Sequence, residues 1–183
     1  MSKAVLISIR PEWCKLIANG KKTIEVRKTR PKLETPFKCY IYCTKGKPLL
    51  YCRPSQCIGN GLIIGEFVCD SIFPLSFYAS DASFFDTEPS FPVPGTCLTD
   101  KEIADYLGNG KTIHGWHISD LMIYDEPKKL DEFMKKPCDF AASCGACVHA
   151  VRVDINGFAG VPVDCEFSVQ RPPQSYCYVE ELE

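Results

Sequence analysis

The chain has 183 residues, of which 45% are hydrophobic and 24% charged, so it is long enough for one domain with a hydrophobic core. With 21 basic and 23 acidic residues its net charge is −2, which argues against a protein that binds nucleic acid over its whole surface. We find no apolar run of about 18 residues and no signal peptide after Met1, so we expect a cytoplasmic protein with no membrane span.

The charge is unevenly distributed along the chain. Between Lys15 and Lys47, lysine and arginine far outnumber the two acidic residues, Glu25 and Glu34, whereas the rest of the chain is acidic. This asymmetry favours a local basic patch on a nearly neutral protein.

Most of the predicted elements are strands. Residues 4–10 form a β-branched strand, and a helix begins at Pro11 and ends at Gly20. Thr99 and Glu102 form a capping box that opens a second helix, to Leu107. The other expected strands are 23–27, 37–44, 61–72, 115–124, 149–155, 166–169 and 176–181, with a short helix at 130–134.

Two segments interrupt this pattern. We interpret residues 73–98 as an insertion rich in aromatic residues and proline, and residues 137–166 as a cysteine-rich insertion. The pattern predicts an α+β, mainly β protein: one domain over residues 1–183, built on a mixed β-barrel of about six strands with short flanking helices.

The segment after the first helix carries most of the functional information. Glu25 and Arg27 alternate on the expected strand and so share one face, while Lys22 lies at the bend before it. A carboxylate between cations can help to bind an anion, or can act as a general base with an electrostatic partner. An exposed ion pair of Glu25 with Arg27 is the alternative.

This segment resembles a known family. The pattern Gly20-x-Lys22-x-x-Glu25-x-Arg27 resembles the signature of ASCH domains, which are PUA-like barrels implied to bind RNA or to act on nucleosides. Residues 171–180, and residues 116–121 before a Pro-Lys-Lys-Leu, resemble ASCH proteins of phages and mobile elements. The resemblance spans the chain, apart from the insertions.

The resemblance implies two activities. Some ASCH proteins are amidohydrolases of an acetylated cytidine, in which a lysine matching Lys22 activates a threonine; Glu25 occupies that threonine's position here. Others are ribonucleases, for which Lys22 and Glu25 could supply acid and base.

Aromatic side chains that stack on bases are expected in single-stranded RNA recognition. Trp116 and Tyr176 are the candidates, beside Trp13 and Tyr42, although Trp13 also fits the apolar face of its helix. We expect Arg10 to add a cation to the site.

Twelve cysteines are many for this length. A tetrahedral structural zinc site could be formed by Cys138, Cys144, Cys147 and Cys165. Reduced, partly buried thiols are the alternative for this set.

The sequence therefore predicts a protein that binds single-stranded RNA or a nucleotide through Lys22, Glu25, Arg27, Arg10, Trp116 and Tyr176. The alternatives are a hydrolase that uses Lys22 and Glu25, and a zinc-stabilised protein-interaction module.

Overall fold

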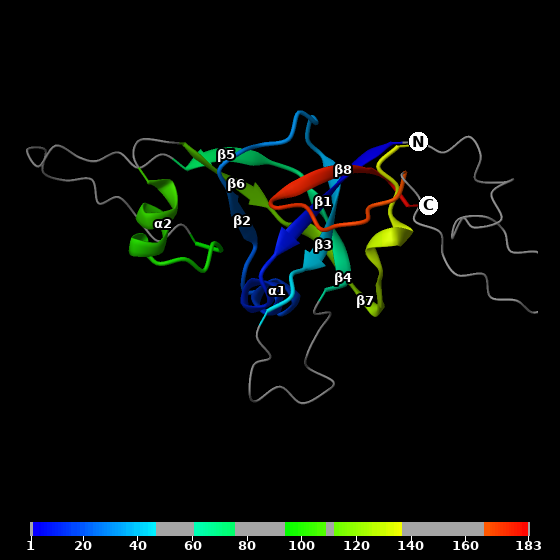
Figure 1. Cartoon of the computed structure of the whole chain (residues 1–183). Helices are drawn as coiled ribbons and strands as arrows, with labels where there is room; N and C mark the ends of the chain where they lie inside the picture. Colours follow the sequence, from blue (N-terminus) through cyan, green and yellow to red (C-terminus); the bar gives the residue numbers. More distant parts are fainter. Residues whose placement is uncertain (1, 47–60, 76–93, 109–111, 137–166, 183) are drawn as a thin grey trace, which may run out of the picture.

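The computed structural model describes residues 2–46, 61–75, 94–108, 112–136 and 167–182. Two α-helices and eight strands form in these residues (Figure 1). In chain order they are β1 (Lys3–Ile9), α1 (Pro11–Ala18), β2 (Ile24–Arg27), β3 (Phe37–Cys43), β4 (Ile63–Cys69), β5 (Ile72–Leu75), α2 (Asp100–Leu107), β6 (Ile113–His117), β7 (Ser119–Lys128) and β8 (Tyr176–Glu180), with a 3-10 turn at Leu130–Glu132 before β8.

The strands form two sheets. The larger has the order β7-β4-β3-β1-β8, in which β1 pairs with β3 in parallel and the other neighbours are antiparallel. The smaller has the order β2-β6-β5 and is antiparallel throughout. The mainly β character with few helices is as predicted, but the described residues form no closed barrel.

Two of the predicted strands each divide at a corner, so that their halves join different sheets and do not continue around one barrel. The predicted strand 115–124 is two strands, β6 and β7, which belong to different sheets; Asp120, just past the break, has a positive φ of 46°. Likewise 61–72 breaks at Asp70–Ser71 into β4 and β5. The chain changes sheets at both corners, as strands do in packed two-sheet arrangements.

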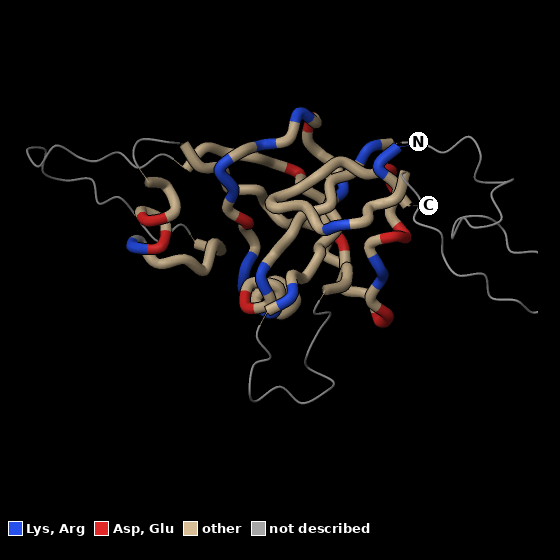
Figure 2. Tube along the Cα trace, in the orientation of Figure 1, with Lys and Arg blue, Asp and Glu red and all other residues tan. Residues whose placement is uncertain are grey.

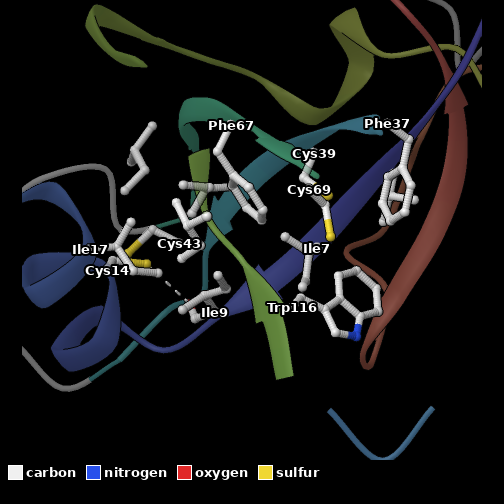
Figure 3. Close-up of a cluster of buried hydrophobic side chains, with 14 residues drawn as sticks. Ile7, Ile9, Cys14, Ile17, Phe37, Cys39, Cys43, Phe67, Cys69 and Trp116 are labelled. Carbon is white, nitrogen blue, oxygen red and sulfur yellow. Dashed lines mark hydrogen bonds between the residues drawn. The ribbon is translucent and has the colours of Figure 1, made fainter. Parts of the chain in front are cut away.

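The main core lies where α1 and the small sheet pack against the large sheet. It includes Ile7, Ile17, Phe67 and Trp116 (Figure 3). Four cysteines are buried here as small apolar side chains: Cys14, Cys39, Cys43 and Cys69. Burial raises the pKa of the Cys69 thiol to about 12, so it stays protonated.

The helix ends follow their sequence signals. Pro11 occupies the first turn of α1, and Gly20, with φ of 68°, turns the chain just after it. The Thr99 hydroxyl accepts a hydrogen bond from the Glu102 backbone N–H, which confirms the capping box of α2.

Several predictions fall on residues outside the described ranges. They include the aromatic segment 76–93, the strand 149–155 and the four proposed zinc ligands Cys138, Cys144, Cys147 and Cys165. Among the described residues, no helix is long and apolar enough to cross a membrane.

Candidate functional site

An ion triad forms the centre of the site. Lys22 lies in the bend after α1, while Glu25 and Arg27 extend from β2; their exposed fractions are 2%, 6% and 8%. Lys22 Nζ lies 3.5 Å from Glu25 Oε2, and Arg27 Nη2 lies 3.0 Å from Glu25 Oε1. The alternative of an exposed ion pair is therefore wrong, because all three groups are removed from solvent.

The Lys22 ammonium is held from several directions. It donates hydrogen bonds to the backbone carbonyls of Ile24 (2.8 Å) and Thr96 (2.7 Å), and it lies 5.3 Å from the centre of the Trp13 ring. Burial lowers the pKa of Lys22, and the attraction of Glu25 opposes this shift. The lysine is thus a fixed cation that loses its proton more readily than one in water.

Arg27 links the triad to the large sheet. Its Nη2 donates to the backbone carbonyl of Ser8 at 2.6 Å, as well as pairing with Glu25. Its buried Nε finds no hydrogen-bond partner among the described residues. One carboxylate faces two cations, so the charged triad has a net charge of +1 and favours an anion nearby.

The triad lines a cleft of about 1040 Å³ between α1, β2, α2 and the segment before β8. Among the described residues, three aromatic side chains line it: Trp13, Tyr42 and Tyr106. Four cations and three acids of the same ranges also contribute, namely Arg10, Lys22, Arg27 and Lys45 with Glu25, Glu102 and Asp105. The cleft therefore combines stacking surfaces with a nearly balanced set of charges.

Four of the six predicted binding residues meet in this cleft. They are Lys22, Glu25, Arg27 and Arg10.

Trp116 and Tyr176 do not line the cleft. Trp116 pairs with Glu25 across β2 and β6, but its ring is 0% exposed and packs edge-on against Phe37 at 6.0 Å. The Tyr176 hydroxyl instead donates to the Arg30 carbonyl at 2.9 Å. Trp116 is a core residue, so the prediction that it stacks on a base does not fit its burial.

The sequence missed the α2 side of the cleft. Asp105 and Tyr106 lie on α2, whose capping box the sequence predicts but whose position beside β2 it does not. A helix that follows an insertion gives no signal of which strand it will face.

No cluster of three or more histidine, cysteine or acidic side chains suited to a metal occurs in the part of the chain that the structure describes. His117 Nδ1 pairs with Asp70 Oδ1 at 2.7 Å. His114 is half-buried, and burial and the charge of Arg30 lower its pKa.

Comparison with known proteins agrees with this geometry. The family model of the ASCH domain matches residues 7–73, a range that contains α1, β2 and the whole triad. ASCH from Zymomonas mobilis has a TM-score of 0.56 at 18% identity, over 97% of this chain and 88% of that one. A serine-to-alanine mutant of the Z. mobilis protein has a TM-score of 0.55 at 17% identity, over 97% and 89%. No curated protein matches.

Residues 7–73 therefore match the ASCH domain, the family whose signature the Lys22, Glu25 and Arg27 pattern resembles. The solved structures share the fold of this chain. The closer resemblance to proteins of phages and mobile elements stays a prediction.

Proposed function

We propose that the cleft binds single-stranded RNA or a nucleotide. The observation that carries the proposal is the buried triad with a net charge of +1, placed in a cleft beside Trp13 and Tyr106. Aromatic rings and cations together are what single-stranded nucleic acid requires, because the bases stack and the phosphates are anionic. The ASCH domain supports this proposal through the nucleic-acid association of that family.

Stability alone is a poor reason for the triad. Burying ions costs several kcal/mol each, and apolar residues of similar size often stabilise a protein equally well or better. Three ionised groups at 2–8% exposure therefore suggest a binding role, which the protein maintains at a cost in folding free energy.

The contacts divide the cations into two roles. Lys22 already donates hydrogen bonds to two backbone carbonyls and faces Glu25, so it supplies a fixed positive charge. It could contact a phosphate only if its 3.5 Å contact with Glu25 were broken. Arg10 and Lys45 are exposed at the rim and can contact phosphate directly. Glu25 holds the buried cations in place, and Trp13 offers a ring to a base.

A hydrolase is the second candidate, because burial lowers the pKa of Lys22. A lysine that loses its proton more readily is better suited to act as a general base. Within the cleft Lys22 and Glu25 could then share acid and base roles, as a ribonuclease requires. Threonine-dependent amide hydrolysis has less support, because Glu25 occupies the position of the threonine.

One experiment separates the candidates. Wild-type protein is incubated with short RNAs and with modified nucleosides, and both binding and products are followed. The test variant is Lys22→Met, which keeps the side-chain length and leaves Glu25 paired with Arg27. The matched control is Lys38→Met, since Lys38 also lies between two carboxylates, at 3.2 Å from Glu66 and 3.3 Å from Glu181, but does not line the cleft.

We expect binding without products, lost in Lys22→Met and kept in Lys38→Met. Products that disappear in Lys22→Met would instead establish the hydrolase. Equal behaviour of the two variants would refute a role for the triad. Stoichiometric zinc with neither binding nor turnover would favour the interaction module.

A further inference from the structure

We propose that the loop after β2 is a second contact surface, which holds the backbone of single-stranded RNA as it leaves the cleft. The surface, here called the basic loop, is residues 28–34. This inference rests on the proposed function and extends it from the nucleotide in the cleft to the strand attached to it.

The basic loop concentrates positive charge. Lys28, Arg30 and Lys32 are all exposed, and Glu34 is its one acidic residue. Figure 2 shows these basic positions following one another along the loop between β2 and β3. Exposed cations in series suit a phosphate backbone, because they can neutralise successive charges without reading the bases.

The loop is held in place by two tyrosines of β8. The Tyr176 hydroxyl donates to the Arg30 carbonyl at 2.9 Å, and the Tyr178 hydroxyl accepts from the Lys32 backbone N–H at 2.7 Å. The Tyr176 ring also packs on the core residue Trp116, with 5.4 Å between ring centres. A loop fixed before binding loses less entropy when the ligand arrives.

The basic loop begins at the cleft. Lys28 directly follows the cleft residue Arg27, and its ammonium lies 4.9 Å from the centre of the Tyr106 ring, which also lines the cleft. Arg30 lies close enough to His114 to lower its pKa, and His114 pairs with Arg27 across β2 and β6. A strand that stacks on Tyr106 would therefore meet Lys28 next.

Charge balance explains why a polyanion needs this surface. The described residues of the cleft include four cations and three acids, a difference of one positive charge, and two of those cations are already paired with Glu25. The basic loop has three cations and one acid, a difference of two. The cleft alone suits a single nucleotide, and the loop supplies the attraction for a longer strand.

The test compares two variants that lose the same charge. The first carries Lys28→Gln, Arg30→Gln and Lys32→Gln. The control carries Lys3→Gln, Lys135→Gln and Lys136→Gln, which are exposed lysines that do not line the cleft. The probes are a labelled nucleoside monophosphate and a labelled RNA of about 12 nucleotides, within the site sizes of known single-strand binders. Thermal unfolding checks that both variants fold.

We expect the basic-loop variant to bind the longer RNA about tenfold or more weakly, with the slope of log affinity against log salt reduced by about 2, while its affinity for the monophosphate is unchanged. The control should behave like the wild type. Equal losses in both variants, no loss in either, or the same loss for both probes would overturn the inference. If the wild type binds neither probe, the proposed function itself fails.

Discussion

Replacing Glu25 by glutamine should strongly destabilise the fold. Glutamine keeps the volume but leaves Lys22 and Arg27 as two buried cations with no counter-charge. At 3.5 and 3.0 Å, and with an effective dielectric constant of about 20, each lost contact is worth about 5 kcal/mol of Coulomb energy. The variant also avoids the cost of desolvating the Glu25 carboxylate, which offsets part of this lost energy. We therefore expect the free energy of unfolding to fall by about 3–5 kcal/mol.

The assay is urea unfolding at neutral pH, followed by circular dichroism. Glu12→Gln is the control, because Glu12 is exposed and its contact with Arg10 is long, at 4.0 Å. This substitution should change the free energy of unfolding by less than about 0.5 kcal/mol. Lys22→Met should cost less than Glu25→Gln, because it leaves a neutral pair with Arg27. A loss below about 1 kcal/mol for Glu25→Gln would show that the triad is solvated, and would refute the reasoning.

Three further predictions concern pH and the aromatic residues. Because the pKa of Lys22 is lower in the folded protein than in the unfolded chain, the unfolded chain binds more protons at this residue. The free energy of unfolding of the wild type, relative to that of Lys22→Met, should therefore rise with pH up to about 10.5. A difference between the two proteins that does not change with pH would contradict the lowered pKa. Hydrogen bonds from Ser2 and Lys38 lower the pKa of Glu181, so its contribution should be lost as pH falls below about 4.5, and acid titration of Glu181→Gln should show a shallower decline. Trp13→Ala should weaken RNA binding by about 1–3 kcal/mol. Because Trp13 is only partly buried against the core, this substitution should cost less stability than Trp116→Ala, for which we expect a loss of about 3–5 kcal/mol; anisotropy titrations beside urea unfolding would expose the reverse pattern.

The sequence predicts local features of this protein better than its long-range arrangement. The strand before Pro11, the turn at Gly20 and the capping box at Thr99 depend on neighbouring residues, and the structure has all three. The triad could also be predicted from the sequence, because Lys22, Glu25 and Arg27 lie within six residues and belong to one recognisable pattern.

The two-sheet arrangement could not be predicted from the sequence, because the apolar pattern continues through the corners at which the chain changes sheets. Nothing in residues 115–124 marks the change of sheet except Asp120 with its positive φ, a conformation that aspartate tolerates. The core position of Trp116 and the cleft position of Tyr106 could not be predicted for a related reason. Their ring types are equally suited to stacking, and only the packing of β6 against the core and of α2 beside β2 separates them.

Crosslinking with RNA tests the central claim most directly. Wild-type protein would be irradiated with a short RNA containing 4-thiouridine, and the crosslinked peptides mapped by mass spectrometry. Binding in the cleft predicts crosslinks at Trp13 or Tyr106, which disappear in Lys22→Met and persist in Lys38→Met. Crosslinks confined to residues that do not line the cleft, or unchanged in Lys22→Met, would contradict the account.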